Sequence, residues 1–80
     1  PRGPVKALSY SIKFEGMKDA DAIAAVKKTL EALADVAEVK IDEENTTATV
    51  TMNAGMALTE EAVKAAFKDT SYSIKSFAKA

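Results

Sequence analysis

The first apolar positions of the chain alternate with polar ones. Between residues 5 and 14, every second residue from Leu8 onward is apolar, and the residues between them are Ser9, Ser11 and Lys13. A period of two places alternate side chains on opposite faces of a strand, so this segment predicts a first strand with one side on a core. The residues expected to face that core are Leu8, Tyr10, Ile12 and Phe14.

Two later segments alternate in the same way and lie close together in the chain. Residues 36–42 and 47–52 are separated by Glu43-Glu44-Asn45-Thr46, a polar run that suits a turn, so the two segments predict a β-hairpin. Threonines fall on one side of the second segment, as in an antiparallel sheet whose one face is open to water. We therefore expect helices on the opposite face only. The residues expected to face the core are Ala37, Val39, Ile41, Ala48, Val50 and Met52, and the outward threonines are Thr47, Thr49 and Thr51.

Two other segments repeat their apolar residues at three- and four-residue spacing, which predicts amphipathic helices. Asp19 suits the N-cap of a helix that extends to about Ala34, and Thr59 suits the N-cap of a helix that extends to about Asp69. Both helices should pack on the sheet. Their inward residues are Ala22, Ile23, Val26, Leu30 and Leu33 in the first helix and Val63, Ala66 and Phe67 in the second.

The last apolar positions predict a short closing strand over residues 71–77, with Tyr72, Ile74 and Phe77 facing the core. The order of elements is then βαββαβ. Two such halves form an α+β, ferredoxin-like sandwich, in which a four-stranded antiparallel sheet carries two helices on one face.

The length of the chain leaves room for one domain. A chain of 80 residues hides only about 60% of its unfolded surface on folding, which does not suffice for two cores. We expect the domain to span residues 5–77. Residues 1–4 contain both prolines and read as a linker or an artificial remnant, and residues 78–80 read as a tail.

The amino-acid composition excludes several classes of binding partner and of metal or catalytic site. Eleven basic and twelve acidic residues give a net charge of −1, so no electrostatic footprint for nucleic acid is present. The chain contains no cysteine and no histidine, which excludes zinc fingers and thiol nucleophiles and leaves the cellular compartment open. The longest apolar-rich stretch is interrupted by Lys27 and Lys28, so we expect a soluble domain without membrane insertion.

Other functions known for this fold class lack their residues here. An acylphosphatase-like enzyme would need an arginine near a phosphate-binding loop, but the only arginine is Arg2. An RNA-recognition domain would place aromatic side chains on the open sheet face, where threonines are expected. We therefore expect no enzymatic activity and no RNA binding. A small-ligand regulatory domain remains an alternative, because its ligands often bind between subunits and leave little trace in the sequence.

Several short segments together resemble one family over about residues 5–77. The pattern is similar to the heavy-metal-associated domain of copper chaperones and metal-transporting ATPases. The resemblance implies the ferredoxin-like fold and, in the first loop of the family, a Gly-Met-x-Cys-x-x-Cys motif whose thiolates bind Cu(I) or Zn(II) and pass the metal to a partner. The segments that carry the resemblance are Phe14-Glu15-Gly16-Met17, Val36 with Val39 and Ile41, Ala48-Thr49-Val50, Ala62-Val63 to Phe67, and Ser71-Tyr72.

Both metal-binding cysteines of the family are missing. Alignment on Gly16-Met17 places Asp19 and Ala22 at their positions. A carboxylate is a hard ligand and alanine offers none, so we expect the Cu(I) or Zn(II) site to be lost and the domain to need no cofactor. Asp19 is expected to cap a helix, and the alternative is a weak hard-cation site with Asp21. The glycine that the family has before its last tyrosine is replaced by Ser71, so that turn should differ.

The remaining sulfur and aromatic candidates have simpler interpretations. The resemblance implies that Met17 is buried under the first loop, Met52 should face the core, and Met56 should lie in an exposed loop. No two of them stand at ligand spacing, so core or loop filling is expected rather than copper binding. Tyr72 corresponds to an aromatic residue near the metal loop of bacterial chaperones and is expected to pack in the core with its hydroxyl at the rim.

These observations favour a non-enzymatic protein-interaction or structural module of a longer protein, which has kept the family core without its metal site. Residual metal binding and a small-ligand regulatory role are the alternatives. The partner would be another protein or a neighbouring domain, docked on the surface around the first loop and first helix. The residues predicted for that surface are Met17, Lys18, Asp19, Asp21, Lys27 and Lys28.

Overall fold

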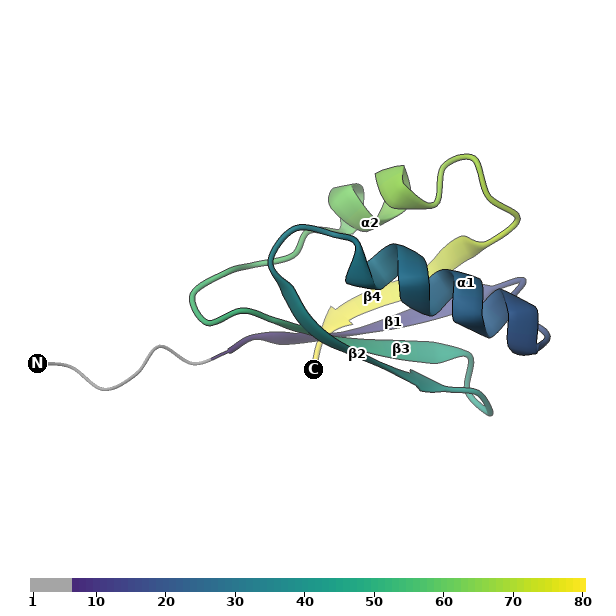
Figure 1. The fold of residues 1–80 in the computed structure, drawn as a ribbon, viewed down its shortest axis with the longest axis horizontal. Helices are drawn as coiled ribbons and strands as arrows, with labels where there is room; N and C mark the ends of the chain where they lie inside the picture. The colour runs from purple at the N-terminus through teal and green to yellow at the C-terminus, as the bar shows by residue number, and fades with distance from the viewer. Residues whose placement is uncertain (1–6) are drawn as a thin grey trace, which may run out of the picture.

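The computed structural model describes residues 7–80 and has the predicted βαββαβ order (Figure 1). Four antiparallel strands form one sheet in the order β2-β3-β1-β4, and both helices lie on one side of it. The predicted α+β, ferredoxin-like fold is therefore confirmed. The elements are β1 Ser9–Glu15, α1 Ala20–Glu31, β2 Val36–Asp42, β3 Thr47–Met52, α2 Glu60–Ala66 and β4 Ser73–Lys79.

The two faces of the sheet differ in polarity, as predicted. Along β3 every second side chain is buried and the intervening threonines are partly exposed. On this open face Ser9 of β1 lies opposite Thr51 of β3, and their hydroxyl oxygens are 3.1 Å apart. The face toward the helices holds the core, because alternate side chains of a strand point to opposite sides.

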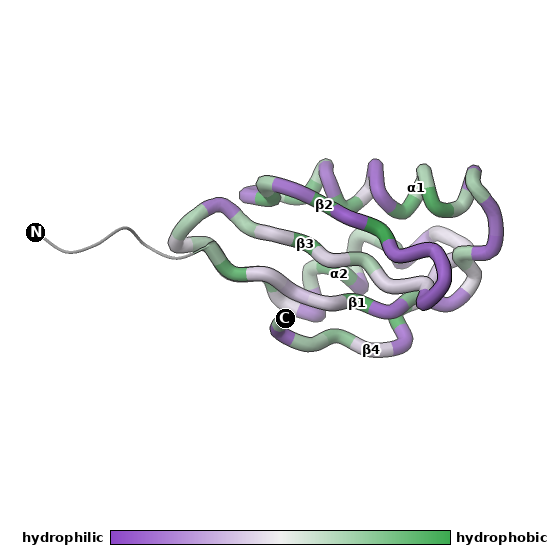
Figure 2. The backbone as a smooth tube through the Cα atoms, turned by 90° about the horizontal axis from the view of Figure 1, so that it is seen from below, coloured by the Kyte–Doolittle hydropathy of each residue, from purple (hydrophilic) through white to green (hydrophobic). Residues whose placement is uncertain are grey.

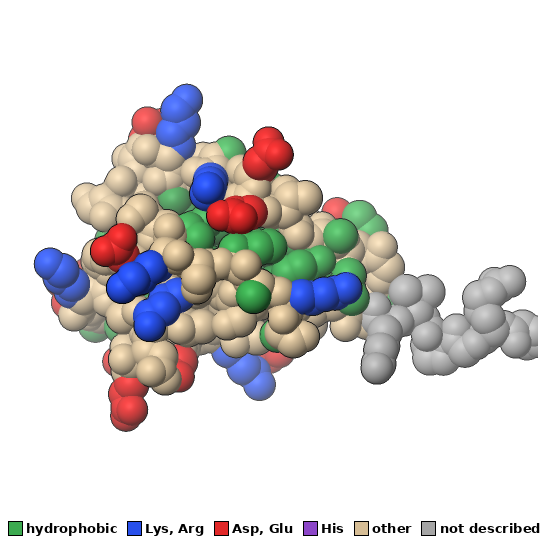
Figure 3. Space-filling model, turned by 180° about the vertical axis from the view of Figure 1, so that it is seen from behind, with side chains coloured by type: hydrophobic (Ala, Val, Ile, Leu, Met, Phe, Trp, Pro, Cys, Tyr) green, Lys and Arg blue, Asp and Glu red, His purple; other side chains and the backbone are tan. Residues whose placement is uncertain are grey.

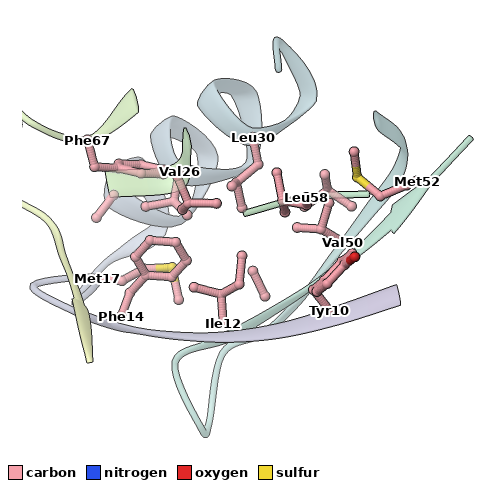
Figure 4. Close-up of a cluster of buried hydrophobic side chains, with 14 residues drawn as sticks. Tyr10, Ile12, Phe14, Met17, Val26, Leu30, Val50, Met52, Leu58 and Phe67 are labelled. Carbon is pink, nitrogen blue, oxygen red and sulfur yellow. The ribbon is translucent and has the colours of Figure 1, made fainter. Parts of the chain in front are cut away.

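The core lies between the sheet and the helices (Figure 4). Phe14 of β1 and Phe67 at the end of α2 meet edge to face, with ring centroids 5.0 Å apart and an interplanar angle of 61°. Burial of one large apolar side chain stabilises a fold by about 1.5–3 kcal/mol, so these few residues dominate the stability of so small a domain. The largest fully buried side chains are Phe14, Ile12, Leu30, Met52, Val26, Val50 and Val63.

Partly buried apolar side chains surround this core. Seen from behind, the molecule shows a band of apolar surface bordered by charged side chains (Figure 3). Phe77 of β4 stacks on Tyr10 of β1, with ring centroids 5.4 Å apart. The partly buried residues packed against the core are Leu8, Ile23, Leu33, Val36, Ile41, Ala66, Tyr72, Ile74 and Phe77.

One predicted core residue of β2 is exposed. Val36 pairs with Met52, but the next pairing joins Glu38 to Thr51, so Ala37 is an extra residue at a β-bulge. A bulge shifts the alternation of inward and outward side chains by one position. As a result Val36 turns toward the core and Ala37 is exposed, which corrects the prediction that Ala37 faces inward.

The closing strand begins and ends two residues later than predicted. β4 runs over Ser73–Lys79, and its pairing with β1 includes Ser11 with Ala78 and Tyr10 with Lys79. The backbone N–H of Ala80 also donates to the carbonyl of Ser9 at 2.8 Å. The expected tail over residues 78–80 is therefore wrong, since these residues continue the sheet.

A second bulge explains the irregular spacing of apolar residues in β4. Ile74 pairs with Phe14 and Ser76 pairs with Lys13, so Lys75 is the extra residue. Without this bulge, residues three positions apart would point to opposite faces of the strand. With it, Ile74 and Phe77 both pack against the core.

The helices are shorter than predicted. α1 ends at Glu31 and not near residue 34, because the chain turns there and Asp35 adopts a left-handed conformation with φ of 65°. α2 ends at Ala66 and not at Asp69, and Phe67 serves as its C-cap. Leu33, predicted to lie on α1, follows that helix in a turn and is still packed against the core.

The start of the chain differs in part from the prediction. β1 begins at Ser9, although the carbonyl of Leu8 still accepts a hydrogen bond of 2.8 Å from the backbone N–H of Met52. The predicted linker over residues 1–4 and the first two residues of the predicted strand lie outside the described residues. Within residues 7–80, no helix is long and apolar enough to cross a membrane.

Candidate functional site

The first loop, residues 16–19, connects β1 to α1 and is the loop in which the resemblance places the metal motif of the family. Gly16 has φ of 91°, and a Cβ atom added there would lie 2.7 Å from the carbonyl oxygen of Ser71. No side chain fits so close to a backbone atom, and a positive φ is unfavourable for L-residues. The loop therefore requires glycine and rests directly on the segment that precedes β4.

Two side chains anchor this loop to the core. Met17 is 3% exposed and belongs to the core cluster, where it points inward in the neighbourhood of Phe14 (Figure 4). Tyr72 is half-buried, and its Cδ1 atom would lie 3.6 Å from a Cβ atom at Gly16. The predictions of a buried methionine and of a tyrosine beside the loop are confirmed. The prediction that Met17 belongs to an outer docking surface is wrong, because its side chain faces the interior.

Asp19, which the sequence analysis aligned with the first cysteine of the family, caps α1. Its backbone is extended, with φ of −138° and ψ of 176°, and its Oδ1 accepts a hydrogen bond of 2.8 Å from the backbone N–H of Ala22. This is the geometry of a side-chain N-cap, which satisfies an N–H that the helix itself leaves without a partner. The predicted capping role of Asp19 is confirmed.

Ala22, which the sequence analysis aligned with the second cysteine of the family, is part of the core. Its side chain is 6% exposed and has no atom that could bind a metal. Cu(I) prefers soft sulfur ligands, and here the position offers a methyl group while the carboxylate of Asp19 already binds a backbone N–H. The residues of the first loop do not fit a soft metal ion.

Other potential ligands lie apart from the first loop. In the described part of the chain, no three Asp, Glu, His or Cys side chains form a group that could hold a metal ion. Met52 is 1% exposed within β3, whereas Met56 is 39% exposed in the loop before α2. The predictions of a core position for Met52 and an exposed loop position for Met56 are confirmed.

The remaining predicted docking residues are exposed. Lys18 and Asp19 belong to the first loop, Asp21 lies in the first turn of α1, and Lys28 lies in the last turn beside Lys27. In residues 7–80 the ion pair that forms joins Lys64 to Glu60 at 3.3 Å, so none of these five charges is paired. We call these five residues the loop–helix surface.

The sequence analysis singled out Ser71 in the turn beneath the first loop but missed the hydrogen bonds that Thr70 makes there. The hydroxyl of Thr70 donates to the carbonyl of Phe67 at 2.8 Å and accepts from the backbone N–H of Tyr72 at 3.2 Å. These bonds shape the turn that presents the carbonyl of Ser71 to Gly16. Ser71 adopts this turn without a positive φ, so the glycine of the family is not needed here. A threonine just after an apolar helical segment was the available signal.

Comparison with known proteins agrees with this architecture. The oxidized MerP from Ralstonia metallidurans CH34 superimposes with a TM-score of 0.71 and 22% identity, over 89% of this chain and 100% of that chain. A protein from Bacillus anthracis str. Ames, described as copper-ion-binding, gives a TM-score of 0.73 and 21% identity over 88% and 97% of the two chains. The CsoZ metallochaperone gives 0.68 and 16% over 86% and 97%. At such identities these similarities show a shared fold.

The family itself is established by sequence. No curated protein matches this chain. The heavy-metal-associated domain matches residues 11–73, which include most of β1, the first loop, both helices and the hairpin. The chain belongs to the heavy-metal-associated domain family.

Proposed function

We propose that this domain is a non-enzymatic member of its family that has lost the thiolate metal site and works as a protein-interaction or structural module. The observation that carries the proposal is what Asp19 and Ala22 do at the two positions aligned with the cysteines of the family. Asp19 binds the backbone N–H of Ala22, and Ala22 itself packs in the core. Both positions now stabilise the start of α1 instead of presenting ligands.

The family context supports a non-enzymatic role. CsoZ is a metallochaperone and the Bacillus anthracis protein is described as copper-ion-binding, so these two neighbours are associated with metal handling. A metallochaperone must meet another protein in order to hand on its metal. Loss of the metal ligands removes the cargo and leaves such a contact surface in place.

The loop–helix surface is the best candidate for that contact. It is built on α1 and on a loop fixed by Gly16 and Met17, so its charges are held on a rigid support. Lys18, Lys27 and Lys28 are cationic and are exposed. Exposed charges of this kind steer a partner of opposite charge and set the salt dependence of binding. We expect an acidic patch on the partner or neighbouring domain.

Charge reversal on α1 tests this function. The affinity of the native protein for a captured partner would be measured by calorimetry at several salt concentrations, for the original chain and for a variant with Lys27→Glu and Lys28→Glu. We expect weaker binding and a smaller salt dependence in the variant, because rim charges act mainly through the salt-dependent part of binding.

A second variant controls for net charge. Lys68→Glu with Lys75→Glu makes the same change in total charge, but Lys68 follows α2 and Lys75 lies on β4, at the sheet edge opposite β2. This variant should bind as the original chain does. Equal weakening in both variants, or none in either, would contradict the assignment of the loop–helix surface.

A further inference from the structure

The turn between β2 and β3 contains a short sequence motif that the proposed function does not use. Asn45-Thr46-Thr47 places a threonine two residues after an asparagine, with a residue other than proline between them. This is the acceptor sequence for N-linked glycosylation, and acceptors lie in surface loops. The other asparagine of the chain, Asn53, is followed by alanine and glycine and lacks the required hydroxyl.

The structure places this sequence at an accessible tip. Glu43, Glu44 and Asn45 are exposed, and the hairpin projects from the sheet on the side away from α2 (Figure 1). The same turn is strongly hydrophilic (Figure 2). Thr46, the residue after Asn45, has φ of 47°, a left-handed conformation that fits a tight reversal of the chain. A bulky group attached to Asn45 would remain in solvent.

The hydrogen bonds of the turn are compatible with modification. The carboxamide nitrogen Nδ2 of Asn45 donates to Oδ2 of Asp42 at 2.8 Å. That nitrogen carries two hydrogens, so one can be replaced while the other keeps the bond to Asp42. The hydroxyl of Thr47 donates to the backbone carbonyl of Asn45 at 2.9 Å, which brings the threonine of the acceptor sequence beside its asparagine.

We propose that Asn45 is an acceptor site for N-linked glycosylation whenever the chain is exposed to an oligosaccharyltransferase. The co-substrate is an oligosaccharide linked to a lipid through pyrophosphate. A bond forms between Nδ2 of Asn45 and the anomeric carbon of the sugar. The bond from that carbon to the pyrophosphate oxygen breaks, the lipid pyrophosphate leaves with the electron pair, and Nδ2 loses one proton. This inference is independent of the loop–helix surface.

Secretion of the whole chain from a eukaryotic host, behind a cleavable leader, tests the site. Intact-mass spectrometry should show a glycan on the original chain, and peptide N-glycosidase should remove it. Asn45→Gln and Thr47→Ala should each abolish the added mass, since one removes the acceptor nitrogen and the other the hydroxyl. Thr46→Ala changes the middle residue and should keep the glycan, as should Asn53→Gln.

Two results would overturn the proposal. One is a secreted, folded original chain without any glycan, with folding verified by circular dichroism. The other is a glycan that persists in Asn45→Gln, which would place the modification elsewhere. Because Thr46→Ala and Thr47→Ala alter neighbouring residues of the same turn, loss of the glycan in both would also contradict the proposal, by pointing to turn structure instead of the acceptor sequence.

Discussion

The two helices of this domain start with the same kind of N-cap hydrogen bond, in which a side-chain oxygen accepts from the backbone N–H three residues later. Asp19 precedes α1 and binds the backbone N–H of Ala22 at 2.8 Å, and Thr59 precedes α2 and binds the backbone N–H of Ala62 at 3.2 Å. Both capping residues have extended backbone conformations. In its local geometry, the start of α1 is therefore an ordinary capped helix start, like that of α2.

The surroundings of the two starts differ. Ala22 is buried in the core, whereas Ala62 is exposed. α1 continues for 12 residues and α2 for only 7. The comparison teaches that Ala22, unlike Ala62, belongs to the core, so changes at the start of α1 should cost more stability than the same changes at the start of α2.

The largest difference in stability between the two helix starts is expected for substitutions of Ala22 and Ala62. Both stand three residues after a cap, where glutamate is normally favourable because it can reach back to the helix start. Ala62→Glu should therefore change the free energy of unfolding by no more than about 0.5 kcal/mol. Ala22→Glu should lower it by about 3–5 kcal/mol, because it buries an unpaired charge. Urea denaturation would measure both, and equal effects would refute the claim that Ala22 belongs to the core.

The glycines that precede each helix give the next largest contrast. Gly16 and Gly55 have φ of 91° and 85°, so an alanine in either position should cost about 1–2 kcal/mol from backbone strain alone. At Gly16 the new Cβ atom also meets the carbonyl of Ser71, which should add about 1–3 kcal/mol. Thermal unfolding of Gly16→Ala beside Gly55→Ala measures the difference, and an identical loss in both would show that the first loop is not held against that carbonyl.

Removal of the caps should give a smaller difference. Either Asp19→Ala or Thr59→Ala should cost about 0.5–2 kcal/mol of stability. We expect Asp19→Ala at the upper end of this range, because its hydrogen bond is shorter and its charge favours the positive end of the helix. Asp19→Asn keeps the acceptor and should recover most of the loss. Chemical denaturation measures both losses. A larger loss of stability for Thr59→Ala would contradict the expectation that the cap of α1 contributes more than the cap of α2.

Asp42, the last residue of β2, gives the smallest effect. The side chain of Asn45 donates to it, and the backbone N–H groups of Asn45 and Glu44 also donate, which together hold the pKa of Asp42 below its ordinary value of 3.8. A lowered folded pKa means that the stabilisation is present above the ordinary pKa and is lost as the pH falls through the folded pKa. In an NMR titration, Asn45→Ala should raise the pKa of Asp42 toward 3.8. An unchanged pKa of Asp42 in this variant would contradict the view that the hydrogen bond from the Asn45 side chain is the main cause of the lowered pKa.

Most of the fold could be predicted from local pattern, because alternation and helical spacing fix which side of each element is apolar. The two bulges could not be predicted from the sequence of one strand alone, since Ala37 and Lys75 are extra residues only relative to their partner strands. The spacing of three between Ile74 and Phe77 was a sign of one bulge. The end of β4 was misplaced because Ala78 and Lys79 carry no strong strand signal of their own.

The candidate site was predictable to a similar degree. The capping role of Asp19 follows from its residue type and position, and the structure bears it out. The contact of Gly16 with the carbonyl of Ser71 depends on two segments far apart in the chain, so no local pattern could reveal it. Met17 was assigned both to the core and to a docking surface, and its burial decides for the core.

Metal binding tests the central claim most directly, namely that the first loop has exchanged its metal site for a capped and packed helix start. The purified domain would be titrated with Cu(I) and with Zn(II) in competition with a chromogenic chelator, beside a variant that carries Asp19→Cys and Ala22→Cys. We predict that the variant competes for the metal through its two thiolates and that the original chain does not. Tight binding by the original chain, especially binding abolished by Asp19→Ala, would contradict the account.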